Sequence, residues 1–100
     1  MKKFIAYEKA VKFYHLASRV KLPYYFRDQL LRASSSVAPN LRESAAKMQP
    51  KEQRRFYNIA LASLRESQTI LELHDCKNSE IWTISDELGA LIWKLIKSRE

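Results

Sequence analysis

Apolar side chains recur at intervals of three and four residues along nearly the whole chain, which is the pattern of helices with one buried face. The first such segment runs from Phe4 to Val20, and its face consists of Phe4, Tyr7, Val11, Tyr14 and Ala17. Further apolar positions widen this face, so we expect the helix to contact two neighbours. It ends before Pro23, because the residue that precedes a proline is disfavoured in helical geometry.

The second segment begins near Pro23 and continues to the break at residues 47–50. Small side chains fill its centre, and Pro39 leaves the carbonyl of Ser35 without its usual N–H donor. A proline in a helix interior costs ~3 kcal/mol, so we expect close packing across the small side chains to offset that cost. The neighbouring serines supply hydroxyls to the disturbed backbone and favour one helix kinked at Pro39, although two helices broken at Ala38 also fit.

The third and fourth segments complete the pattern. Pro50 suits the first position of a helix that runs to about His74, and Asn78 or Ser79 caps the last helix. Gly89 costs ~1 kcal/mol in mid-helix relative to Ala, so we expect another backbone to pass close to it. Short links join antiparallel neighbours, so the sequence predicts an all-α, up-down-up-down four-helix bundle that forms a single domain, residues 1–100.

Composition narrows the class of protein further. One Gly and three Pro are too few for the turns of a sheet protein. The lone Cys76 has no partner for an internal disulfide, which indicates a reducing compartment. No apolar run reaches the ~18 residues of a membrane helix, and no signal-peptide pattern occurs. We therefore expect a cytoplasmic protein with no membrane partner.

The formal net charge is +7, and it is unevenly distributed. Residues 1–60 carry thirteen Lys or Arg against four Asp or Glu, whereas residues 61–100 carry five against seven. This balance suits binding to polyanions or pairing of one subunit with the next, while a merely solvated surface is the competing interpretation. The predicted nucleic-acid-binding residues are Arg27, Arg32, Arg42, Lys47, Lys51, Arg54, Arg55 and Arg65.

Half of this basic set crowds the turn before the third helix, and Arg54 and Arg65 return to nearly the same helix face. Contacts from such residues to phosphates give affinity without sequence choice. Three tyrosines add a second possibility, because they either stack on bases or belong to the core or an interface. They are Tyr24, Tyr25 and Tyr57.

Polar residues on otherwise small or apolar faces predict a structural network that fixes helix register, with a ligand site as the alternative. They are Asn40, Glu43, Ser63 and Glu66. Nearby arginines are plausible partners for the two carboxylates, so we do not expect them to be catalytic. No Glu-x-x-His motif occurs, and His15 and His74 lie far apart in sequence, so we expect no metal, no cofactor and no enzymatic activity.

Two motifs resemble those of a known family. The first is Arg32-Ala33, then Ser36-Val37-Ala38-Pro39-Asn40-Leu41, then Glu43; the second is Arg55-Phe56-Tyr57, Ile59-Ala60, Ser63-Leu64 and Glu66. They are similar to the second-helix and third-helix signatures of the small bacterial four-helix-bundle proteins encoded by intervening sequences in large-subunit ribosomal RNA genes. Ser44 stands where many members carry glycine.

The resemblance implies a left-handed bundle that assembles into a pentameric ring and has no catalytic activity. A related protein, the accessory variability determinant of diversity-generating retroelements, is basic and binds nucleic acid and a reverse transcriptase. We therefore expect a non-enzymatic homo-oligomer that binds RNA or DNA non-specifically through its basic surface. The alternative is an adaptor for a protein partner that handles nucleic acid, such as a reverse transcriptase.

Overall fold

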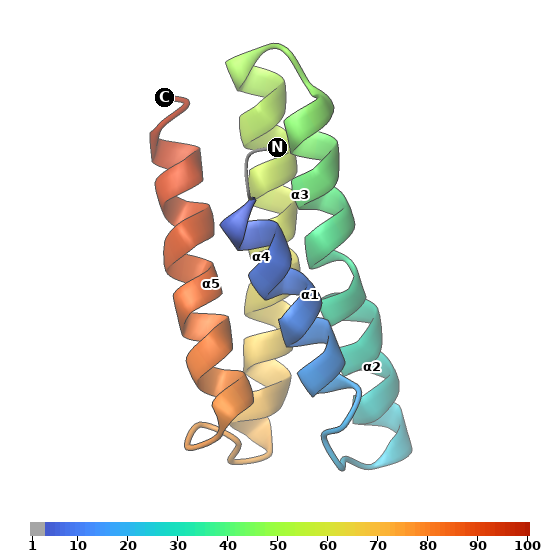
Figure 1. Cartoon of the computed structure of the whole chain (residues 1–100). Coiled ribbons are helices and arrows are strands. Elements are labelled where there is room, and N and C mark those ends of the chain that lie inside the picture. Colours follow the sequence, from blue (N-terminus) through green and yellow to red (C-terminus); the bar gives the residue numbers. More distant parts are fainter. Residues whose placement is uncertain (1–3) are drawn as a thin grey trace.

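The computed structural model describes residues 4–100, so the first three residues of the predicted domain lie outside it. The described chain is all-α and contains no strand, which confirms the predicted class. Its five helical segments are α1 (Ile5–Ala17), α2 (Tyr24–Ser35), α3 (Val37–Ala46), α4 (Pro50–Leu73) and α5 (Glu80–Lys97). In Figure 1, α2 and α3 follow one another as a single interrupted rod, so the segments make four rods.

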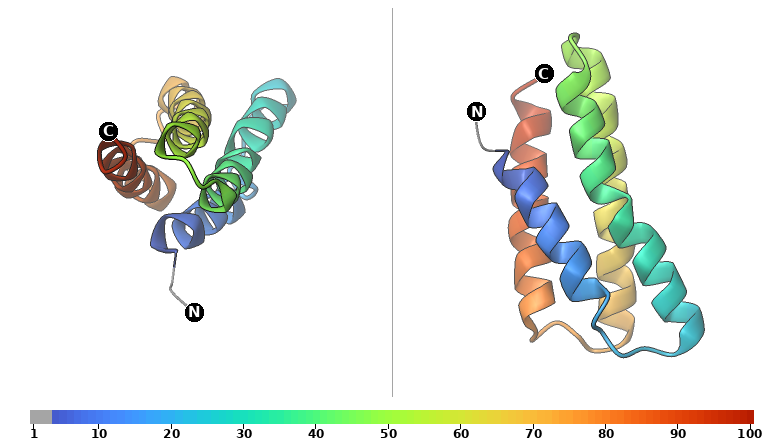
Figure 2. Two further views of the ribbon diagram at one scale, coloured as in Figure 1. Left: turned by 90° about the horizontal axis from the view of Figure 1, so that it is seen from above. Right: turned by 45° about the vertical axis from the view of Figure 1, so that its right-hand side comes forward.

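The four rods lie side by side around a common axis (Figures 1 and 2). The chain descends through α1, rises through α2 and α3, descends through α4 and rises again through α5. The long helix α4 packs against α2, α3 and α5, while α1 packs against α2, α3 and α5. The α3–α4 turn therefore lies at the same end of the molecule as the end of α5 (Figure 1).

The rod formed by α2 and α3 is interrupted at Ser36, three residues before Pro39 and two before Ala38. Ser36 keeps helical dihedral angles, but its N–H donates to the carbonyl of Ala33, one residue nearer than in an α-helix. Pro39 is consequently the third residue of α3, in the first turn, where a helix N–H has no partner within its own helix. This placement explains why the chain tolerates the proline there.

Most helix boundaries agree with the sequence pattern. Pro50 opens α4 with Glu52 in the first turn, and Ser79 precedes α5. The exception is α1, which ends at Ala17 and not at Val20. Beyond Ala17 the backbone tightens, since the N–H of Arg19 donates to the carbonyl of Leu16 and that of Val20 to Ala17.

Small side chains are buried on both α4 and the α2–α3 rod, and the Ser63 hydroxyl of α4 meets Ser36 Oγ between α2 and α3. Ser34, Ser44 and Ser67 are fully buried, as is Ala60, whereas larger apolar side chains fill the centre of the bundle. The bulkiest fully buried residues are Phe13, Leu30, Leu41, Leu64, Leu71, Leu88 and Ile92. Small residues let two helices approach closely, which was the packing expected around the serine-rich stretch.

Gly89 has a different neighbour from the one expected. A Cβ built there would lie 3.5 Å from Arg65 Nη1 and 3.5 Å from Leu64 Cδ2, both side-chain atoms of α4. The expectation that another backbone passes close to Gly89 is therefore wrong. The space beside this glycine is taken by the Arg65 guanidinium lying along α5, and an extra methyl group fits there at ordinary contact distance.

Candidate nucleic-acid interface

Four of the predicted basic residues gather where α3 turns into α4, and these four we call the turn cluster: Lys47, Lys51, Arg54 and Arg55. Lys51 and Arg55 are exposed, and Lys47 and Arg54 are half-buried. Among residues 4–100, only Lys47 of this cluster forms an ion pair, with Glu43 at 3.1 Å. The other three cations are therefore not neutralised by a described carboxylate.

The turn cluster is joined to the end of α5 by direct contacts. The Arg54 guanidinium donates to the backbone carbonyl of Arg99, and Arg99 Nε donates to Gln53 Oε1 at 3.0 Å. Arg99 also lies over the Tyr57 ring, 5.4 Å from its centroid. These contacts fix the last residues of α5 beside the first turns of α4.

Three cations that the prediction did not include therefore belong to the same end of the bundle. They are Lys94, Lys97 and Arg99. In the sequence, their position in and after the last helical turn is accounted for by the helix dipole alone. The up-down order of the helices is the signal that could have found them, because it returns the fourth rod to the end where the second and third rods are joined.

Aromatic rings lie among these cations. Lys47 and Arg55 flank Phe56, with Nζ 5.3 Å and Cζ 5.4 Å from the ring centroid. Lys97 lies 5.2 Å from the centroid of Trp93, whose side chain is 52% exposed. The charged groups themselves lie over the ring faces, so the rings help to hold these cations in place at the surface.

The remaining predicted cations lie elsewhere, so the eight residues do not form one patch. Arg42 on α3 covers the Tyr7 ring at 4.3 Å, and Arg32 on α2 pairs with Asp28 at 3.1 Å. Arg65 donates to Gln68 Oε1 at 3.0 Å. Arg27 is exposed near the start of α2, toward the opposite end of the bundle.

Arg54 and Arg65 do share a face of α4, as their spacing predicts, but it is the face turned to α5. Arg54 bonds to the end of α5, and Arg65 lies against Gly89. Arg54 is half-buried and is therefore less available to an external anion than Lys51 and Arg55, whereas Arg65 is exposed.

The predicted polar network is assembled around Ser36, which the prediction omitted. Asn40 Nδ2 donates to the Ser36 carbonyl at 2.8 Å and to its Oγ at 3.0 Å, and the Ser63 hydroxyl donates to the same Oγ at 3.0 Å. Glu43 is turned to Lys47 instead, and Glu66 lies exposed on α4. The structure thus brings Asn40 and Ser63 together and leaves both carboxylates outside.

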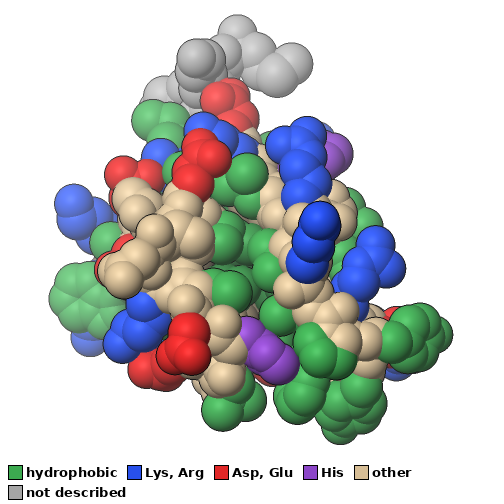
Figure 3. All heavy atoms as spheres, turned by 90° about the horizontal axis from the view of Figure 1, so that it is seen from below, with side chains coloured by type: hydrophobic (Ala, Val, Ile, Leu, Met, Phe, Trp, Pro, Cys, Tyr) green, Lys and Arg blue, Asp and Glu red, His purple; other side chains and the backbone are tan. Residues whose placement is uncertain are grey.

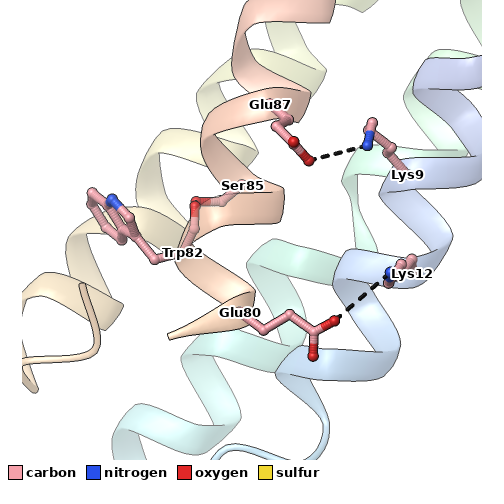
Figure 4. Close-up of polar contacts among 6 residues, drawn as sticks. All are labelled: Lys9, Lys12, Glu80, Trp82, Ser85 and Glu87. Carbon is pink, nitrogen blue, oxygen red and sulfur yellow. Dashed lines mark hydrogen bonds and ion pairs between the residues drawn. The ribbon is translucent and has the colours of Figure 1, made fainter. Parts of the chain in front are cut away.

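Two of the three acidic side chains of α5 face α1. Lys9 Nζ lies 3.1 Å from Glu87 Oε1, and Lys12 Nζ lies 3.8 Å from Glu80 Oε2 (Figure 4). These pairs neutralise part of the negative charge of the C-terminal half within the same chain. Of the turn cluster, Lys47 is offset in this way by Glu43, and the other three cations have no such partner among residues 4–100.

The three tyrosines separate into two kinds. Tyr57 is 2% exposed and belongs to the core, which is the second of the two alternatives that the sequence left open. Tyr24 and Tyr25, at the start of α2, are 83% and 63% exposed. The spacing of residues along a helix does not distinguish the buried tyrosine from the exposed ones. Tyr24 and Tyr25 are exposed because α1 ends before it reaches the start of α2 and so does not cover them (Figure 1).

Within the described part of the chain, no three His, Cys, Asp or Glu side chains come together as a metal site would require. None of the helices in residues 4–100 has the length and apolar character needed to cross a membrane.

The family follows from a comparison with protein-family models. The model described as 23S rRNA-intervening sequence protein matches residues 2–78, more than half of the chain. The chain belongs to this family. Both motifs quoted above lie inside the matched range, whereas α5 lies beyond it.

No curated protein and no solved structure was found to match the chain. Membership of the 23S rRNA-intervening sequence protein family therefore rests on α1 to α4 and the loop that follows them. The similarity to the accessory variability determinant stays a prediction.

Proposed function

We propose that this family member is a non-enzymatic, cytoplasmic homo-oligomer that binds RNA or DNA without sequence preference at the end of the bundle carrying the turn cluster. One observation carries the proposal. The cations at this end are Lys47, Lys51, Arg54, Arg55, Lys94, Lys97 and Arg99. Among the described residues, Glu43, Glu52 and Glu100 oppose them there, so seven positive charges against three negative ones give a net charge of +4.

The arrangement suits phosphate binding. Lys51 and Arg55 are one helical turn apart at the start of α4 and are both exposed, so one backbone segment can contact both. Such contacts release condensed counterions from the nucleic acid and do not depend on base sequence. Arg54 acts differently, because its bond to the end of α5 positions the neighbouring cations.

Self-association is supported by apolar surface on the described chain. Phe4, Ile5, Leu91 and Leu95 line a groove of about 400 Å³ between α1 and α5, and Ile5 is 56% exposed. Ile59 on α4 and Trp93 on α5 are further exposed apolar side chains that a second copy could cover. A ring needs two different patches that meet head to tail. In a pentamer, the basic end would be presented five times.

The test compares fluorescently labelled RNA and duplex DNA in low salt. We expect K51A/R55A to weaken the binding of both and to reduce the salt slope by about one for each side chain removed. The matched control is K12A/K77A, which removes equal charge from two lysines already paired with Glu80 and Glu72. Equal binding by K51A/R55A and wild type would contradict the proposed site.

The alternative function, an adaptor for a protein partner, predicts a different result for the same purified protein. If the wild-type protein bound neither RNA nor DNA at low salt, the proposal would fail. A protein partner recovered by affinity capture after nuclease treatment would then favour the adaptor.

A further inference from the structure

We propose that the opposite end of the bundle stacks unpaired bases on Tyr24 and Tyr25, so that the protein prefers single-stranded nucleic acid to a duplex. This inference rests on the proposed function and adds the class of ligand to it. The two tyrosines are neighbours at the start of α2, and their side chains are 83% and 63% exposed. No other aromatic side chain among residues 4–100 is as exposed as either of them.

The ring of Tyr25 is held in place from two sides. Its hydroxyl accepts a hydrogen bond from Gln29 Nε2 at 3.0 Å, and its ring meets Phe26 edge-on with centroids 5.2 Å apart. Phe26 in turn packs edge-on against His74, 4.5 Å away, in the loop after α4. A ring that is anchored yet exposed loses little conformational freedom when a flat partner stacks on it.

Two cations flank the tyrosines in the sequence. Lys21 and Arg27 are exposed, and neither forms an ion pair within residues 4–100. Asp28, the nearest acidic residue in the sequence, is already paired with Arg32 at 3.1 Å. Seen from this end, apolar side chains gather over the start of α2, and Lys and Arg side chains line the adjoining surface (Figure 3).

This combination selects one kind of occupant. Aromatic faces beside cations accept stacked bases and the phosphates between them, and stacking tolerates any base because every base has a flat face. In a duplex the base faces are covered by their neighbours, so only the phosphates remain to be contacted. An acidic protein partner would contact only the cations, and an apolar one only the rings. A single-stranded nucleic acid uses both, because its bases stack on the rings and its phosphates contact the cations.

The experiment measures the affinity of wild-type protein for a labelled oligothymidylate and for a hairpin duplex with the same number of phosphates, at one salt concentration. We expect tighter binding of the oligothymidylate. Y24A and Y25A should each weaken that binding by about tenfold and leave duplex binding unchanged. Y24F/Y25F keeps both rings and should bind as wild type does, and L73A, which removes an exposed apolar side chain without a ring, should have no effect.

The outcomes separate this inference from the proposed function. Binding of neither probe overturns both. Equal affinity for the two probes, or an alanine variant that binds the oligothymidylate as wild type does, overturns the preference for single strands and leaves the basic end standing. A lower oligomeric mass of Y24A/Y25A in light scattering also overturns it, because the tyrosines would then join copies of the chain.

Discussion

At the scale of single residues, the sequence correctly predicted that Asn40 and Ser63 belong to one polar network but not what lies beside Gly89. Helical spacing places Asn40 and Ser63 on faces turned toward the core, and the structure brings them together. The same spacing does not show which neighbour fills the space beside Gly89, because that depends on the conformation of the Arg65 side chain. Local pattern gives the direction of a side chain but not the identity of the atoms it meets.

Gly89→Ala tests the space beside the glycine. We expect the free energy of unfolding to rise by about 1 kcal/mol, because Ala is the better helix former and the added methyl group meets only side-chain atoms at 3.5 Å. Thermal or urea denaturation of the variant and the wild type measures this difference in the free energy of unfolding. The matched control is Ala90→Gly at the exposed neighbouring position, which should lose a similar amount. A loss of stability in Gly89→Ala would show that the site is tighter than described.

Asn40→Ala tests the network around Ser36. The Asn40 amide supplies a 2.8 Å bond to the Ser36 carbonyl, which the backbone N–H of Asn40 reaches only at 3.4 Å. We therefore expect the variant to lose about 1 kcal/mol in the free energy of unfolding. Asn58→Ala, an exposed change on α4, should be close to neutral, and an equal effect of the two variants would show that the network is unimportant.

At the scale of helices, the sequence located most boundaries, because proline, serine and polar breaks act locally on the backbone. It placed the interruption of the second rod at Pro39 or Ala38, whereas the structure has it at Ser36. The sequence shows the missing N–H of the proline but not where the helix absorbs the disturbance. That position depends on bonds to the next rod, such as the one from Ser63 to Ser36.

Pro39→Ala distinguishes the two positions. In the first turn of α3 the proline removes no bond within that helix, so we expect the free energy of unfolding to change by much less than the ~3 kcal/mol of an interior proline. Denaturation with urea measures the change. A gain close to the interior value would place the proline inside a continuous helix.

At the scale of the whole molecule, the sequence recorded an excess of cations but not their distribution. The eight predicted residues divide between the two ends and the sides of the bundle, and Lys94, Lys97 and Arg99 join the turn cluster only through the antiparallel course of the chain. Such neighbours are far apart in sequence and close in space.

Self-association is measured by light scattering on the purified protein. We expect the mass of five 11.8 kDa chains, because the apolar groove between α1 and α5 and the exposed side chains of α4 and α5 are then covered. Ile5→Glu, in the groove, should lower that mass, whereas the exposed polar change Thr83→Glu should not. A monomer at high concentration would exclude the ring.

The central claim is that the basic end of this bundle binds the phosphates of nucleic acid. The salt dependence of the affinity for a labelled RNA tests it most directly. The account predicts measurable binding at low salt. It also predicts that the logarithm of the association constant falls linearly with the logarithm of the salt concentration, with a slope of about −0.7 to −0.9 for each phosphate neutralised. Binding that is absent at low salt, or that does not change with salt, would contradict it.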